Sequence, residues 1–228
     1  MYHRFDDLIY DKSVDDPTNL FHYEETEASL AAIACTGILY GLHSFAKKGD
    51  DPIQLYFIPP GMIRSSVPIV NGRVILQFSD VFRLLAMGFD KNGKAGFPIV
   101  DFYLNKKELS LMIESISILQ SLLSPQIGFA FSDSVTLESQ IGIPFINRLN
   151  LTIGGVTYYD LPDLVHVATN SFLAEWLCRS EEMTFGMLSL MPKDKTGRHL
   201  NMDDLIQRAE RLGSLREFDL LSVYLRSL

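Results

Sequence analysis

The feature that most constrains this chain is a run of 19 residues, from Ala28 to Ala46, that contains no Asp, Glu, Lys or Arg. Glutamates stand just before the run, and Lys47 and Lys48 follow it. Acidic residues at the start of a helix and basic residues at its end complement the helix dipole, and Gly49 stands where such a helix would end. The run therefore predicts one long helix that must be covered on most of its sides.

This helix could be covered by lipid or by the rest of the protein. Its length is close to that of a membrane span, and Gly37 and Gly41 have the spacing that lets membrane helices pack closely. The run also contains polar residues such as His43 and Ser44, and the chain has no second run like it. We therefore favour a central buried helix over a membrane span at residues 28–46.

Short apolar segments separated by turn residues indicate β-strands further along the chain. Residues 52–58 and 97–104 have the composition of strands. Asn71-Gly72 and Gly154-Gly155 each join two apolar segments, and such a pair of residues is a strong local signal for a β-hairpin. The sequence therefore predicts at least two hairpins.

Helix signals alternate with these strands. Asn105 begins a long helix that extends to about residue 123, and Pro162-Asp163 opens another over residues 163–178. Asn201 and Ser214 begin two helices at the C-terminal end. Together these signals predict an α+β fold with a central buried helix, two or more β-hairpins and a C-terminal helical pair.

The chain reads as one domain preceded by an arm. Residues 1–23 mix acidic and large apolar residues without a clear period, which indicates an N-terminal arm. Residues 24–228 contain neither an internal repeat nor a Pro-, Gly- or Ser-rich linker. We therefore expect a single α+β domain there, and any seam within it falls near residues 124–134.

The charge and the cysteine content limit which partners and which cellular compartment we expect. The formal net charge is −8, and residues 1–51 carry −6 of it, so we expect no nucleic-acid partner. Cys35 and Cys178 lie in apolar runs, which favours free thiols in a reducing compartment. Residues 1–10 lack the apolar core of a signal peptide. We expect a cytoplasmic protein whose partners carry basic surfaces.

The residues from Phe89 to Ile99 invite a test for a calcium loop. If Asp90 is the first ligand, Lys94 occupies the place of the fifth. If Gly93 is the central glycine, Ile99 occupies the place of the last ligand. Neither alignment supplies enough oxygen ligands, so these residues predict a turn in which Asn92 and Gly93 provide the positive φ angles.

Candidate catalytic residues gather where the helix over residues 163–178 is expected to begin. Asp163, His166 and Asn170 are three and four residues apart, so on a helix they would share one face. A carboxylate beside an imidazole can perform general acid–base chemistry. The alternative is that Asp163 only charges the first turn of the helix, while His166 and Asn170 are polar residues without a catalytic role.

Motifs for other kinds of chemistry are absent from the sequence. It contains no Gly-x-Ser-x-Gly nucleophile motif and no glycine-rich phosphate loop. The five histidines include no pair at the spacing of a zinc or haem site. We therefore expect no cofactor and no metal.

Partner-binding residues are expected on the arm and on the last helix. Phe5 and Tyr10 are large apolar residues of the arm. The last helix has apolar side chains on more than one side, including Phe218, Leu221 and Tyr224. One stripe could pack inward while another contacts a partner; the alternative is that the whole helix packs into its own core.

Two functional hypotheses follow from the sequence. The first is a non-catalytic interaction protein, a subunit, adaptor or chaperone-like component that binds other subunits or itself. The second is a small-ligand-binding protein or a hydrolase-type enzyme whose site is built around Asp163, His166 and Asn170. The apolar helices and the absent motifs favour the first.

Overall fold

The computed structural model describes residues 34–47, 49–58, 69–70, 73–74, 85, 93–122, 130–132, 135–137, 151–183 and 190–227. These residues form an α+β fold. The N-terminal arm, the Asn71-Gly72 turn and most of residues 124–134 lie outside the described residues.

The main sheet has four strands of mixed direction. Their spatial order is β4 (Ile99–Asn105), β9 (Leu164–Asn170), β1 (Leu55–Ile58) and β5 (Ala130–Phe131). β9 pairs antiparallel with β4 along its whole length and parallel with β1, while β1 pairs antiparallel with β5. β9 therefore lies between two strands that are far from it in the sequence.

Two smaller sheets contain the predicted hairpins, and both hairpins are confirmed. β2 (Ile69–Val70) pairs with β3 (Arg73–Val74). The other sheet has the order β6 (Val135–Leu137), β7 (Leu151–Ile153) and β8 (Val156–Thr157). At the β7–β8 turn, Gly154 and Gly155 have φ angles of 60° and 76°, which L-residues with a side chain rarely adopt.

The helices largely follow the sequence signals. They are α3 (Lys106–Leu122), α4 (Ser171–Leu177), α5 (Ser180–Met183), α6 (Met202–Arg211), α7 (Glu217–Ser227) and a helix over residues 34–45. The side chain of Asn105 accepts a hydrogen bond from the backbone of Lys107 at the start of α3. Asn201 and Asp204 form a reciprocal capping box at the start of α6.

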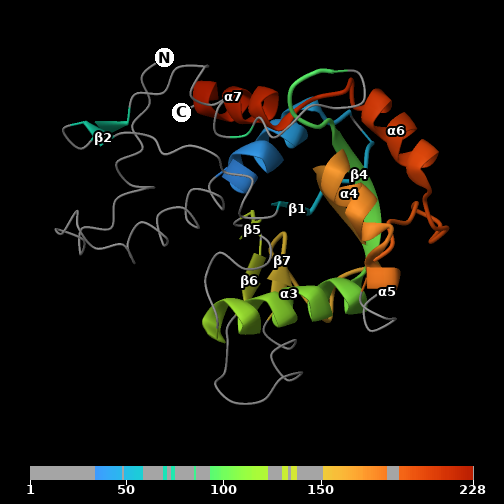
Figure 1. The fold of residues 1–228 in the computed structure, drawn as a ribbon. Coiled ribbons are helices and arrows are strands. Elements are labelled where there is room, and N and C mark those ends of the chain that lie inside the picture. Colours follow the sequence, from blue (N-terminus) through green and yellow to red (C-terminus); the bar gives the residue numbers. More distant parts are fainter. Residues whose placement is uncertain are drawn as a thin grey trace.

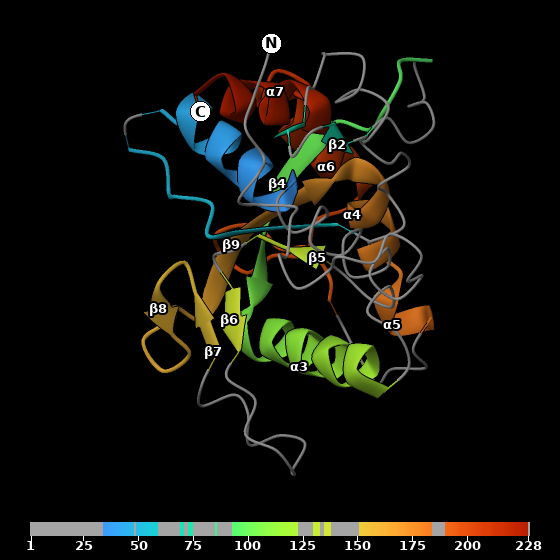
Figure 2. The ribbon, with the colours of Figure 1, turned by 90° about the vertical axis from the view of Figure 1, so that its left-hand side faces the viewer.

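Helices cover both faces of the main sheet (Figures 1 and 2). On one face, alternate residues of the strands pack with α3, α4, α6 and β7, as Phe57 and Phe102 do. On the other face, Tyr56, Ile58 and Ala168 pack with the 34–45 helix and α7. Both views place α7 beside the 34–45 helix at one end of the described residues and α3 at the opposite end.

The 34–45 helix and α7 contact each other at two glycines. A Cβ atom on Gly41 would lie 2.6 Å from the carbonyl oxygen of Leu220, and one on Gly37 would lie 2.6 Å from side-chain atoms of Leu221 and Tyr224. The glycine spacing therefore serves close packing between these two helices, and Tyr40 on the same helix remains 47% exposed. Within the described ranges, we find no helix whose length and hydrophobicity would let it span a bilayer.

Two of the expected local structures are wrong. Residues 164–170 form strand β9, and the helix begins only at Ser171. The three β-branched residues Val165, Val167 and Thr169 alternate along β9, and pairing with β4 and β1 overrides the helix signal of Pro162-Asp163.

The second correction concerns the start of α7. The sequence predicts that Ser214 begins this helix. Instead α7 begins at Glu217, and the side chain of Asp219 accepts a hydrogen bond from the backbone of Arg216. The Glu217 carboxylate turns into the core, where Tyr56 and Asn170 donate hydrogen bonds to it.

Replacing Gly41 with alanine tests the contact between the two helices. Gly41→Ala would place a methyl group against the backbone of Leu220, which side-chain motion cannot relieve. We expect a loss of about 1–3 kcal/mol in the free energy of unfolding, even though alanine favours a helix by about 1 kcal/mol over glycine. Urea denaturation followed by circular dichroism measures the change.

Gly37→Ala is the matched comparison for this prediction. Its added methyl group would meet the side chains of Leu221 and Tyr224 rather than backbone, so the loss should be smaller. A Gly41→Ala protein as stable as the original would contradict the packing described here.

Candidate functional site

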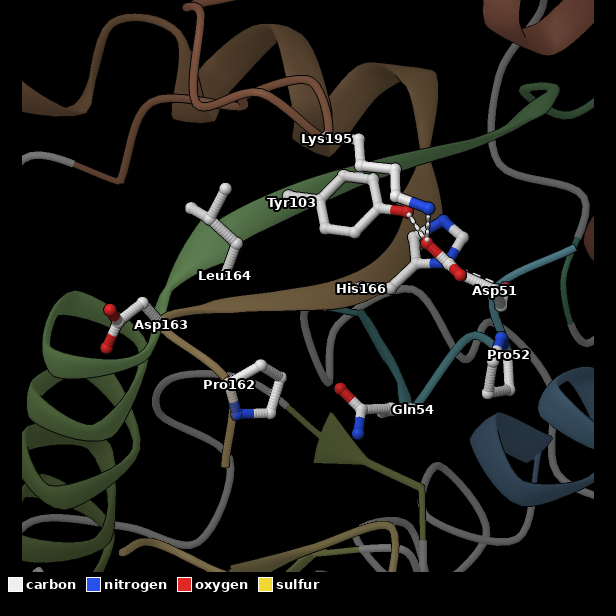
Figure 3. A pocket seen from close by; sticks show the side chains of 9 residues that line it. All are labelled: Asp51, Pro52, Gln54, Tyr103, Pro162, Asp163, Leu164, His166 and Lys195. Carbon is white, nitrogen blue, oxygen red and sulfur yellow. Dashed lines mark hydrogen bonds and ion pairs between the residues drawn. The ribbon is translucent and has the colours of Figure 1, made fainter. Parts of the chain in front are cut away.

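A pocket of about 480 Å³ lies where the start of β9 meets the residues before β1 and the loop around residue 195 (Figure 3). The residues that line it are Asp51, Pro52, Gln54, Tyr103, Pro162, Asp163, Leu164, His166 and Lys195. This volume lies within the range of small-molecule sites, roughly 300–1,000 Å³. The pocket is therefore the candidate functional site of the described residues.

His166 projects from β9 beside Tyr103 of β4, its direct cross-strand partner. The two rings stack with centroids 4.5 Å apart and an angle of 8° between their planes. Nδ1 of His166 lies 3.0 Å from the backbone oxygen of Asp51, and Nε2 lies 2.9 Å from Oδ2 of Asp101. Both partners are hydrogen-bond acceptors, so only the doubly protonated ring can donate to both.

Asp101 connects His166 to α6. Nη1 of Arg208 lies 3.0 Å from Oδ2 of Asp101 and also donates to its backbone oxygen at 3.2 Å. Burial by itself would raise the pKa of Asp101, but the hydrogen bond from His166 and the charge of Arg208 outweigh it and lower that pKa. Asp101 is therefore an ionised anchor between β9 and α6.

Asp51 holds the other side of the pocket. Its Oδ2 accepts a hydrogen bond from the Tyr103 hydroxyl at 2.9 Å and lies 2.7 Å from Nζ of Lys195. The hydrogen bonds from Lys195 and Tyr103 lower the pKa of Asp51. Conversely, burial and the neighbouring Asp51 carboxylate raise the pKa of Tyr103. At neutral pH the pair is an ionised carboxylate and a neutral phenol.

The structure brings together only two of the three residues expected to form a catalytic site. Asp163 and His166 both line the pocket. Asp163 is 92% exposed, and its Oδ1 lies 3.7 Å from Nζ of Lys106. Asn170 is buried at the other end of β9. The prediction that the three residues share one face of a helix is wrong, because Asp163 precedes strand β9 while His166 and Asn170 lie on it. Their catalytic role stays a prediction.

Asn170 belongs instead to a buried polar cluster with Tyr56 and Glu217. Oε1 of Glu217 accepts hydrogen bonds from the Tyr56 hydroxyl at 2.6 Å and from Nδ2 of Asn170 at 2.9 Å. Oδ1 of Asn170 accepts one from the backbone of Leu173 and so begins α4. Burial raises the pKa of Glu217 to about 7, although the two hydrogen bonds to it act in the opposite direction.

Neither cysteine is placed as a reactive nucleophile. Burial, with the nearby Glu217, raises the pKa of the Cys35 thiol well above its ordinary value, and its Sγ lies 3.5 Å from the backbone oxygen of Ala130. Burial also raises the pKa of Cys178. Protonated thiols are poor nucleophiles, which agrees with the sequence interpretation of both residues as free and unreactive.

Among the described residues, no group of three or more His, Cys, Asp or Glu side chains could hold a metal ion. Gly93 has the positive φ angle, 73°, that the predicted turn requires. Asp90 and Asn92 lie outside the described residues.

Of the expected partner-binding residues of α7, Leu221 and Tyr224 lie against the 34–45 helix, and Phe218 lies near Gly96. Leu221 is 4% exposed, and Phe218 and Tyr224 are partly buried against the same core. The rings of Tyr224 and Tyr40 are 5.3 Å apart. Phe5 and Tyr10 lie outside the described residues. The partner-binding role of these residues stays a prediction.

The sequence interpretation missed most of the pocket. Of its residues, Tyr103 carried a readable signal, because it alternates with the buried Phe102 and Leu104 along β4 and so lies on the opposite face. Lys195 lies in a polar loop and carried no such signal.

Comparison with known proteins adds no family to this description: no protein-family model matches the chain, and neither does any curated protein. The fold and the site define an α+β protein with a pocket at the start of strand β9.

Glu217→Gln tests the buried cluster through the pH dependence of stability. The pKa of Glu217 rises from 4.5 to about 7 on folding. Its contribution is therefore fully present below about pH 4.5 and is lost as the pH rises through about 7, a change of about 3 kcal/mol. Glutamine stays neutral, so the stability of the variant relative to the original should increase by about 2–3 kcal/mol between pH 5 and pH 8.

Urea denaturation at a series of pH values between 5 and 8 measures this difference. Glu182→Gln removes a carboxylate that is 79% exposed and should give a pH-independent difference. A Glu217→Gln difference that is equally flat would show that Glu217 titrates normally in the folded protein.

Proposed function

We propose that this protein is a non-catalytic subunit or adaptor of a larger protein assembly in a cytosolic compartment. The observation that carries the proposal is the pair of aromatic rings, Tyr40 and Tyr224, where the 34–45 helix meets α7. Tyr40 is 47% exposed although it contacts Tyr224, and Phe45 on the same helix is 51% exposed. Tyrosine and phenylalanine are enriched in protein–protein interfaces.

This surface refines the expectation for α7. Leu221 packs inward against Gly37, so it supports the helix pair rather than offering contact area. Tyr224 lies at the edge of the pair beside Tyr40. We name Tyr40 and Tyr224 the aromatic helix surface and infer that it is the docking site.

The proposed occupant is a different polypeptide with a net positive charge. The chain carries a net charge of −8, and association between oppositely charged proteins is accelerated over their neutral equivalents. Two copies of this chain would repel each other by the same argument, so self-association is the weaker alternative.

An enzyme built on Asp163, His166 and Asn170 receives less support. Asn170 bonds to Glu217 in the core, away from the pocket. Both nitrogens of His166 lie within 3.0 Å of oxygens of the protein, so a substrate would have to displace one of these contacts to exchange a proton with the ring. The polar residues of the pocket hold β4, β9, α6 and the residues before β1 together.

Site-specific photocrosslinking tests this proposal. A photoreactive phenylalanine derivative replaces Tyr40 in the full chain, and the chain is expressed in its own host cell and irradiated. We expect a covalent product with a second, basic polypeptide, identified by mass spectrometry. The same derivative at Tyr159, an aromatic position that is 66% exposed on the loop after β8, is the control and should give several-fold less product.

Two outcomes would overturn the proposal. Equal yields at the two positions would mean that exposure alone determines crosslinking. A product that contains only two copies of this chain would identify self-association in place of a separate partner.

A further inference from the structure

Three pocket side chains retain hydrogen-bonding capacity that the structure does not use. Asp163 is 92% exposed, and its 3.7 Å contact with Lys106 exceeds the length of a hydrogen bond. Lys195 is 72% exposed and uses one of its three N–H groups on Asp51. Among the described residues, no hydrogen bond to the side chain of Gln54 occurs, although Gln54 lines the same pocket.

The charged groups lie on different sides of the pocket. Figure 3 shows Asp163 on the left, next to Pro162 and Leu164, and the Lys195 ammonium on the right, above Asp51. Asp51 fixes this ammonium at 2.7 Å and is itself fixed by the Tyr103 hydroxyl at 2.9 Å. The pocket therefore presents a negative group at one side and a positioned positive group at the other.

We propose that this pocket binds a small zwitterion of the size of a dipeptide, with its ammonium group at Asp163 and its carboxylate at Lys195. Pro52, Pro162 and Leu164 supply apolar surface for the body of such a ligand. The amide of Gln54 can donate to or accept from a peptide group. This inference goes beyond the proposed assembly function and uses none of the residues of the aromatic helix surface.

Ligands whose charges all have the same sign fit these groups less well. A phosphate or a dicarboxylate would bring negative charge toward both Asp51 and Asp163, and a diamine would bring positive charge toward Lys195. A zwitterion meets Asp163 at its ammonium end only, and at its carboxylate end it meets Lys195, whose ammonium is shared with Asp51. The volume of about 480 Å³ leaves room for it.

Three related peptides distinguish the two ends of the ligand. Glycyl-leucine carries both charges, its N-acetyl derivative lacks the ammonium, and glycyl-leucinamide lacks the carboxylate. Each is titrated into the full ¹⁵N-labelled chain, with the amide signals of the pocket residues followed by NMR. We expect glycyl-leucine to bind about two- to fivefold more tightly than either derivative, because exposed ion pairs contribute little.

Two neutral substitutions assign each charge. Asp163→Asn should abolish the difference in affinity between glycyl-leucine and its N-acetyl derivative. Lys195→Gln should abolish the difference in affinity between glycyl-leucine and glycyl-leucinamide. Both side chains are mostly exposed, so the fold should be preserved. Lys107→Gln, at another exposed lysine, is the control and should change neither difference.

Either of two results would overturn the proposal. One is the absence of a saturable shift at the pocket up to roughly 10 mM glycyl-leucine, well above the millimolar affinity expected of a weak site. The other is equal affinity for all three peptides, which would show that neither charge takes part in recognition.

Discussion

The buried carboxyl group of Glu217 determines how the helical layers are held on the sheet. Its Oε1 atom accepts from Tyr56 on β1 and from Asn170 at the end of β9, so α7 is bonded to two strands at once. Asn170 also begins α4 through Oδ1. A polar group without a partner costs free energy in the core, so these hydrogen bonds restrict α7 to one depth and one orientation.

This position of α7 requires the two glycines on the 34–45 helix. With α7 fixed by Glu217, the two helices can share the sheet face only if they approach closely, and any side chain at Gly41 would meet the backbone of Leu220. The pair then covers the part of that face around Tyr56 and Ala168. The part around His166 is left to the pocket, so the packing of the helices determines where the pocket can form.

The sequence predicts the elements whose signals are local. Three of these signals are confirmed: the capping residues of α3, those of α6, and the glycine pair between β7 and β8. Each of them depends only on residues a few positions away in the sequence. β9 escaped prediction because its structure depends on pairing with β4 and β1, which lie about 60 and 110 residues away in register. The pocket was missed for the same reason, since Asp51, Tyr103 and Lys195 meet only after the sheet has formed.

The way the charges around the pocket are paired supports the proposed binding site more than a catalytic one. A general base needs a lone pair that can reach a substrate proton, whereas His166 directs both nitrogens at fixed acceptors. Asp101 is likewise occupied by His166 and Arg208. Recognition of a ligand does not need such a lone pair, because a charge that is held in place and is open to solvent is sufficient. Lys195 meets that condition, since it is mostly exposed and Asp51 positions it, and Asp163 adds an exposed charge on the other side of the pocket. The same residue, Asp51, therefore contacts His166 through its backbone oxygen and positions Lys195 at the edge of the pocket through its carboxylate.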